Sequence, residues 1–159
     1  RHNFDWKLII AQIYQESHFD PYAISTKGAQ GLMQLTEAMA TEMGVTDTFD
    51  PHQSIDAGVA RLKNLYDFYD NATGWDRVYI ALAAYNVGVG HMLDARNLAR
   101  KMDLNPDRWT SMVKTLPLLS QYRYFRDTIY GYCDGKQPLK YVRRIRSCYD
   151  ILNYHHPGP

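Results

Sequence analysis

The spacing of apolar residues along the chain predicts helices, and no segment shows a persuasive two-residue alternation of the kind that strands need. A first helix is predicted over residues 5–17, with Asp5 as its N-cap. Its two faces are an apolar stripe of Trp6, Ile9, Ile10, Ile13 and Ser17 and an outer face of Lys7, Ala11 and Gln15. Glu16 projects from the rim of the stripe and is not part of the outer face.

Further helices are predicted along the rest of the chain. Thr36 caps a short helix that ends at Gly44, and Asp50 caps the strongest helix, with Pro51 in its first turn. The apolar stripe of that helix consists of Ile55, Val59, Leu62, Leu65, Tyr66 and Tyr69. A helix over 75–86 is broken by Gly88 and Gly90, and the remaining helices cover about 91–102, 106–114, 118–130 and 138–152. The predicted fold class is therefore all-α.

Composition and charge narrow the class of protein. The chain has 159 residues, 45% hydrophobic and 22% charged, which fits one globular domain of ordinary size. Its formal net charge of +1 argues against a nucleic-acid binder. No apolar run is long enough to span a membrane. The 13 Tyr and 3 Trp suit either a core or the floor of a sugar-binding groove, and composition does not separate these.

Metal and thiol chemistry find little support in the sequence. Cys133 and Cys148 lack the spacing of a zinc site, and they either pair in an oxidising compartment or remain thiols. The six His are scattered, and the His155–His156 pair lies at a loose terminus. We therefore expect no metal and no cofactor.

Four short motifs carry the candidate chemistry. They are "ESHFDPYAIS" at 16–25, "KGAQGLMQLT" at 27–36, "ALAAYNVGVG" at 81–90 and "LKYV" at 139–142. Each one alone fits a loop or a helix end, and none forms a nucleotide-binding loop. In this order and at these separations they resemble the lytic transglycosylase family of peptidoglycan-cleaving enzymes. The resemblance covers roughly residues 10–152 and implies a lysozyme-like α fold, related to goose-type lysozyme, with a substrate groove across one face.

The resemblance also implies a role for individual residues. The catalytic acid would be Glu16, and Ser25 would help to hold that glutamate and the substrate. The late tyrosine that approaches the glutamate would be Tyr141. The remaining substrate-binding positions would be Met33, Gln34, Tyr85 and Asn86.

Cleavage of a glycosidic bond needs suitable carboxyl groups, so each acidic residue near a motif or helix end is a candidate. A carboxylic acid protonates a leaving oxygen near neutral pH only if its pKa is raised, and we expect desolvation to do this for Glu16. A usual glycosidase needs a second carboxylate. Asp20 reads as a turn residue, Asp50 as an N-cap, and Asp76 and Asp94 as acids near helix starts. The sequence therefore offers one convincing carboxylate, Glu16.

One carboxylate is enough for the mechanism that the resemblance implies. Glu16 would protonate the oxygen between N-acetylmuramic acid and N-acetylglucosamine, and then accept the proton of the muramic 6-hydroxyl as it closes on C1. A hydrolytic muramidase would instead use water and a second acid. A non-catalytic peptidoglycan-binding module would not need the acid, and a purely structural helical domain would leave the motifs unexplained.

The resemblance sets the expected context of the chain. Residues 1–159 would form a single catalytic domain, the C-terminal module of a longer chain with a regulatory module before residue 1. Its partners would be peptidoglycan glycan strands in the periplasm, with attachment to the outer membrane through the missing part. The basic run "KYVRRIR" is most simply a solvated helix face, and contact with acidic stem peptides or a partner domain is an alternative.

Overall fold

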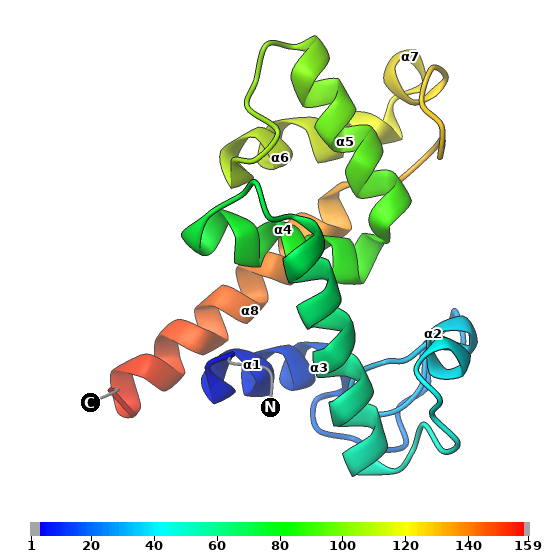
Figure 1. The fold of residues 1–159 in the computed structure, drawn as a ribbon, viewed down its shortest axis with the longest axis vertical. Helices are drawn as coiled ribbons and strands as arrows, with labels where there is room; N and C mark the ends of the chain where they lie inside the picture. Colours follow the sequence, from blue (N-terminus) through cyan, green and yellow to red (C-terminus); the bar gives the residue numbers. More distant parts are fainter. Residues whose placement is uncertain (1–3, 158–159) are drawn as a thin grey trace. The chain divides into compact units, whose positions relative to one another are not determined.

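The structure, a computed structural model, describes residues 4–157. Within that range the regular elements are helices, joined by turns and by two isolated β-bridges, which confirms the predicted all-α class (Figure 1). In chain order these are α1 (Trp6–Ser17), α2 (Glu37–Glu42), α3 (Pro51–Phe68), α4 (Gly74–Val87), α5 (Val89–Lys101), α6 (Trp109–Thr115), the 3-10 helix η1 (Leu116–Ser120), α7 (Tyr122–Phe125) and α8 (Lys136–His155).

The helices group into two compact units. The first unit combines residues up to Lys63 with those from Arg144 onward, and the second covers Asn64–Arg143. Helices α3 and α8 are each continuous and contribute residues to both units. The first unit therefore contains α1 and α2, and the second contains α4 to α7 with η1.

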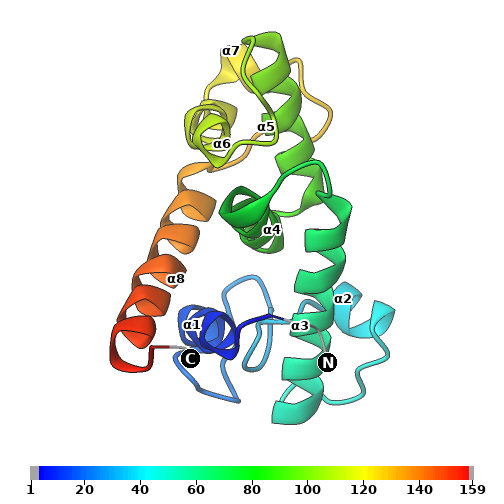
Figure 2. The same cartoon turned by 60° about the vertical axis from the view of Figure 1, so that its left-hand side comes forward.

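In the first unit, α1 packs against the C-terminal part of α8 (Figure 2). The predicted N-cap is confirmed, because the Asp5 carboxylate accepts a hydrogen bond from the Lys7 backbone N–H at 3.0 Å. The same carboxylate accepts a hydrogen bond from the Tyr149 hydroxyl at 2.9 Å. The Lys7 ammonium donates to the Asn153 side-chain oxygen at 2.8 Å. These long-range bonds hold the start of α1 on α8.

The predicted faces of α1 are partly wrong. Lys7 and Ala11 were expected on the outer face, but they are only 5% and 0% exposed, whereas Trp6 from the apolar stripe is 54% exposed. The contact between Lys7 and Asn153 of α8 explains part of the difference, since the neighbouring helix covers a face that spacing alone assigned to solvent. Glu16 is half-buried, in agreement with its predicted place at the rim.

In the second unit, α4 has a stretch of consecutive residues, Ile80 to Ala84, that are all buried. A helix that is buried on every side shows little amphipathic pattern. Three of the five residues in this stretch are alanines, which allow close approach of neighbouring helices. Helices α5 and α6 are both neighbours of α4 in this unit.

Two boundary predictions in the second unit are wrong. Gly88 does cap α4, but Gly90 breaks nothing and lies in the first turn of α5. Gly90 is needed for a different reason, because a Cβ atom there would collide with the ring of Tyr130. The predicted helix over 118–130 is replaced by η1, the single turn of α7 and an irregular segment.

The irregular segment after α7 has a clear physical cause. The Thr128 hydroxyl donates to the Phe125 carbonyl oxygen at 2.8 Å and accepts from the Gly131 N–H at 3.2 Å, which closes a turn. The next two backbone N–H groups, of Ile129 and Tyr130, donate to a carboxylate on α5. Because these donors are used outside the segment, they do not continue a helix.

Candidate active site

Glu16 lies in the last turn of α1, directly before a strained stretch of backbone. His18 and Phe19 have φ values of 52° and 66°, in the left-handed region that non-glycine residues rarely adopt. The His18 N–H donates to the Tyr14 carbonyl at 2.9 Å and closes the helix. Each such residue costs on the order of 1–3 kcal/mol and persists only where the surroundings hold it. The chain therefore leaves α1 after Ser17, two residues beyond Glu16 at His18, in one costly conformation.

Ser25 lies in a tight turn in the first unit, as part of the same motif as Glu16. Its hydroxyl oxygen accepts hydrogen bonds from the backbone N–H groups of Lys27 at 3.3 Å and Ala29 at 3.0 Å. Both bonds use the lone pairs of the hydroxyl, so its O–H still has a hydrogen to donate. A donor of this kind suits the predicted role beside a carboxylate.

Gln34 ties the second motif to the first. It has a left-handed backbone, with φ of 51°. Its side-chain amide nitrogen donates to the carbonyl oxygens of Ala23 at 3.2 Å and Gly31 at 3.0 Å. Both bonds use Nε2, which leaves Oε1 as a possible acceptor for a substrate. The half-buried position of Gln34 is compatible with the groove predicted there.

Met33 has a different environment. Its side chain is 0% exposed and packs on Gly58 of α3. Its backbone N–H donates to the buried hydroxyl of Ser54, also on α3, at 3.2 Å. Met33 therefore anchors the loop of the second motif on α3, and it has no exposed surface with which to line an open groove.

The other predicted site residues belong to the second unit. Tyr85 and Asn86 lie in the last turn of α4, where Tyr85 is half-buried and Asn86 is exposed. Tyr141 lies in α8 and is 4% exposed. Glu16 belongs to the first unit. The meeting of these three residues with Glu16 stays a prediction of the sequence.

Two of the alternative acids have the structural tasks that were predicted. Asp20 is a turn residue, since its carboxylate accepts from the Tyr22 N–H at 2.9 Å. Asp50 is the N-cap of α3 and accepts from the Gln53 N–H at 2.8 Å. Both carboxylates are thus committed to local backbone.

The other two acids are also committed to structure, one of them for an unexpected reason. Asp76 lies in the first turn of α4, as predicted, and it also accepts from the Trp109 N–H at 2.7 Å. Asp94 was expected near a helix start, but it is buried in the middle of α5. Its two carboxylate oxygens accept from the N–H groups of Ile129 at 3.2 Å and Tyr130 at 2.9 Å. Long-range bonds of this kind leave no local signal in the sequence.

The described part of the chain has two cysteines outside any disulfide, and it contains neither a metal-binding cluster nor a membrane-spanning helix. Cys133 and Cys148 are both outside any disulfide, and burial raises the pKa of the Cys148 thiol. Residues 4–157 contain no group of three or more His, Cys, Asp or Glu side chains arranged to hold a metal ion. No helix over the same residues is long and apolar enough to cross a membrane.

The sequence and the fold of this chain both resemble those of known proteins. The family described as "Transglycosylase SLT domain" matches residues 1–107, which is most of the chain. The chain therefore belongs to the transglycosylase SLT domain family, and the resemblance seen in the four motifs is confirmed. The crystal structure of the 70 kDa soluble lytic transglycosylase from Escherichia coli superimposes with a TM-score of 0.62 at 20% identity, over 99% of this chain and 23% of that one. This likeness supports the predicted lysozyme-like fold.

Curated relatives of this chain share one name within the family. The chain is 52% identical over 153 residues to the membrane-bound lytic murein transglycosylase F of Desulfosudis oleivorans, covering 96% of this chain and 34% of that protein. It is 49% identical over 150 residues to the protein of the same name from Maricaulis maris, covering 94% and 33%. The sequence predicts this narrower likeness from stretches such as "WDRVYIALAAYNVGVGH", and the relatives confirm it. The chain spans about a third of the length of these relatives.

Proposed function

We propose that this domain cleaves the glycan strands of peptidoglycan as a lytic transglycosylase, at the β-1,4 bond between N-acetylmuramic acid and N-acetylglucosamine. One observation carries the proposal. Glu16 lies half-buried at the end of α1 within the family-matched segment, while the four other acids considered are engaged with backbone N–H groups. A half-buried carboxyl at the end of a helix, within the family-matched segment, is suited to proton transfer.

The proposed reaction has two steps, and Glu16 takes part in both. In the first step the Glu16 carboxylic acid gives its proton to the glycosidic oxygen while the bond from C1 to that oxygen breaks. The muramic 2-acetamido group stabilises the positive charge that develops at C1. In the second step the Glu16 carboxylate takes the proton of the 6-hydroxyl of the same sugar as its oxygen bonds to C1. The product is a 1,6-anhydro ring, Glu16 is protonated again, and no water is consumed.

Other residues support this chemistry in the proposal. Ser25 would donate its remaining hydroxyl hydrogen to Glu16 or to the substrate, in line with the bonding of its oxygen in the turn. Tyr85 and Asn86, at the end of α4, would bind the substrate, and Tyr141 would orient Glu16. Intramolecular attack by the 6-hydroxyl gains from a high effective concentration, so a second carboxylate is not required.

The proposed setting of the domain follows from the relatives. They are named as membrane-bound proteins and are about three times as long as this chain. We therefore propose that the domain acts in the periplasm, where peptidoglycan is found, as the catalytic module of a longer chain. Attachment to the outer membrane and regulation by a module before residue 1 are parts of the same proposal.

A hydrolytic muramidase is the competing function, and the products distinguish the two. Purified peptidoglycan should be digested in ¹⁸O-labelled water and the fragments analysed by mass spectrometry. Lytic transglycosylation should give unlabelled anhydromuramic ends that are one water lighter than hydrolytic ends. Reducing-end fragments that carry the heavy label would reject the transglycosylase reading.

A further inference from the structure

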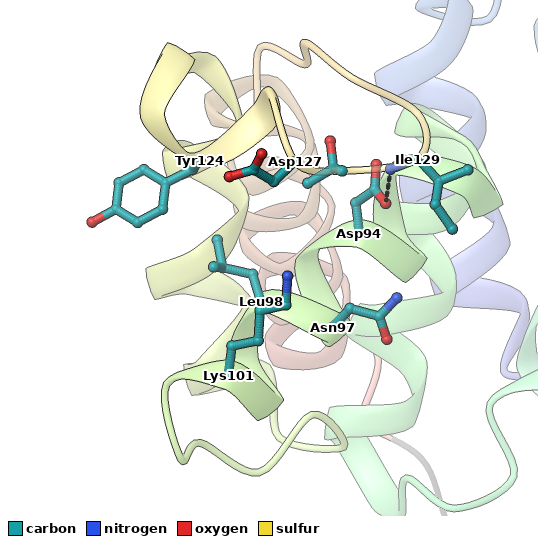
Figure 3. Close-up of a pocket in the computed structure, with 8 residues that line it drawn as sticks. Asp94, Asn97, Leu98, Lys101, Tyr124, Asp127 and Ile129 are labelled. Carbon is teal, nitrogen blue, oxygen red and sulfur yellow. Dashed lines mark hydrogen bonds between the residues drawn. The ribbon is translucent and has the colours of Figure 1, made fainter.

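The second unit contains an open cavity that is separate from every residue named above as catalytic or substrate-binding. It lies between α5 and the stretch from the end of α7 to Ile129 (Figure 3). Its volume is about 320 Å³. This volume is within the range of small-molecule sites, which begins at about 300 Å³. The α5 wall carries Asp94, Asn97, Leu98 and Lys101, which share one helix face because they are spaced by three and four residues.

The opposite wall is held in place by the α5 wall. Asp94 is 2% exposed, and its carboxylate accepts from the N–H groups of Ile129 and Tyr130. The Thr128 hydroxyl fixes the preceding turn through bonds to Phe125 and Gly131. The cavity is therefore bounded by two segments whose separation is set by hydrogen bonds.

Opposite charges face this cavity without pairing with each other. Lys101 extends from α5 toward the wall that carries Asp127 (Figure 3). Lys101 forms no ion pair with any residue in the described range 4–157. Asp127 pairs with its neighbour Arg126 at 3.3 Å, and both of those side chains are largely exposed, so that pair is weak. An ammonium and a carboxylate are thus left on opposite walls of one cavity.

The rest of the lining suits a ligand that carries both charges. The Asn97 side-chain oxygen accepts from Arg100 at 2.8 Å, so the Asn97 amide nitrogen is left as a donor one turn from Lys101. Both groups can donate to the same carboxylate. Leu98 and Ile129 add apolar surface to the lining.

We propose that this cavity binds an amino-acid end that carries an ammonium and a carboxylate on one carbon. The ligand carboxylate accepts from Lys101 and Asn97, the ligand ammonium donates to Asp127, and a short aliphatic stem lies on Leu98 and Ile129. The diamino acid of a peptidoglycan stem peptide has such an end. The inference rests on the proposed function for its substrate class, and it adds a stem-peptide subsite in the second unit to the glycan site.

The test measures binding of a free peptide, so it does not depend on glycan cleavage. The ¹⁵N-labelled 159-residue chain should be titrated with the tripeptide L-Ala-γ-D-Glu-meso-diaminopimelate. The comparison ligand has lysine in place of the diamino acid, and so lacks the carboxylate next to the terminal ammonium. We expect amide shifts confined to α5 and residues 124–130, and binding of the lysine peptide weakened about fivefold or more, as for loss of a charge-assisted contact.

Matched variants assign the charges. Lys101→Met and Asp127→Asn should each weaken binding of the diaminopimelate peptide several-fold, and both side chains are exposed, so neither change should disturb folding. Lys114→Met and Asp103→Asn remove equivalent exposed charges of the second unit that do not line the cavity, and they should leave binding unchanged.

The outcomes separate this inference from the proposed function. Equal binding of the two peptides, equal binding by Lys101→Met and the native chain, or amide shifts outside the cavity walls would each overturn the subsite. Absence of any shift at millimolar peptide would overturn it as well. None of these results would change which products form when glycan strands are cleaved. Conversely, labelled hydrolytic products would reject the proposed function without changing the measured binding of the peptide.

Discussion

The Met33 side chain lies against the backbone of Gly58, so closely that a Cβ atom at position 58 would come 2.5 Å from the Met33 Cβ atom. Met33 is fully buried, and Gly58 lies in the middle of α3. The contact joins the loop of the second motif to α3. A glycine inside a helix normally weakens it, and here the close approach explains why glycine is present.

Gly58→Ala should therefore destabilise the protein although alanine is the better helix former. Overpacking of a close contact typically costs about 1–3 kcal/mol, against a helix-propensity gain of about 1 kcal/mol. Urea unfolding followed by circular dichroism measures the difference. Asn64→Ala, at an exposed position of the same helix, is the matched control and should be neutral or slightly stabilising. If Gly58→Ala is as stable as the native chain, the loop that carries Met33 can move away from α3 without cost, and the prediction is wrong.

Glu16→Gln should fold normally and lose activity on peptidoglycan. Glutamine is nearly isosteric with glutamate but cannot give a proton to the leaving oxygen, and loss of general acid catalysis typically costs about 10²–10⁴-fold. Release of soluble fragments from purified peptidoglycan measures the rate. The control is Glu42→Gln, which changes an exposed carboxylate in the last turn of α2 and should retain full activity. Native-like cleavage by Glu16→Gln would remove the central assignment.

Asp94→Asn should loosen the segment after α7. The asparagine side chain has one acceptor oxygen where the carboxylate has two, so one of the Ile129 and Tyr130 N–H groups loses its partner. We expect the free energy of unfolding to fall by about 1–3 kcal/mol, which is typical when a buried polar group loses its hydrogen-bond partner. Amide hydrogen exchange should accelerate at residues 129 and 130 and much less in α4. Asp70→Asn, at an exposed position, should change neither quantity.

Cys148 should react more slowly with alkylating reagents in the folded chain than in the unfolded chain at mildly alkaline pH. Burial raises the pKa of its thiol, so a smaller fraction is the reactive thiolate at a given pH. The neutral thiol is the form that folding favours. Its contribution to stability is thus complete below the unfolded-state pKa and is lost as the pH rises through the folded-state pKa. Iodoacetamide labelling with peptide mass spectrometry, in buffer and in urea, compares the two pH midpoints. A folded midpoint at or below the unfolded one would contradict the burial of the thiol.

Motifs in the sequence predicted which residues belong to the candidate site, but not what each of them contacts. Glu16, Ser25 and Gln34 were predicted as site residues from the resemblance, and their roles stay predictions. The structure shows that Glu16 is half-buried and that the side chains of Ser25 and Gln34 form hydrogen bonds to nearby backbone. Met33 was expected to line the groove from its place in the motif, but it fills the space against Gly58. A motif records which residues occur together and does not distinguish a residue that touches substrate from one that supports the loop beneath it.

The sequence by itself determined the features that depend on neighbours within a few positions. The caps formed by Asp5, Thr36 and Asp50 were predicted because each side chain bonds a backbone N–H two or three residues further on. The existence and bounds of α1, α2 and α3 follow from the same local signals together with helical periodicity.

The tertiary structure alone decided which surfaces those helices bury and where irregular backbone replaces a helix. Lys7 is buried because Asn153, far along the chain, receives its ammonium. Residues 126–130 leave the predicted helix because Asp94 on α5 takes the N–H groups of Ile129 and Tyr130. These partners are distant in sequence, and a hydrogen bond or a packed contact forms wherever the fold brings its two groups together. Local periodicity carries no information about such encounters, so only the three-dimensional arrangement could reveal them.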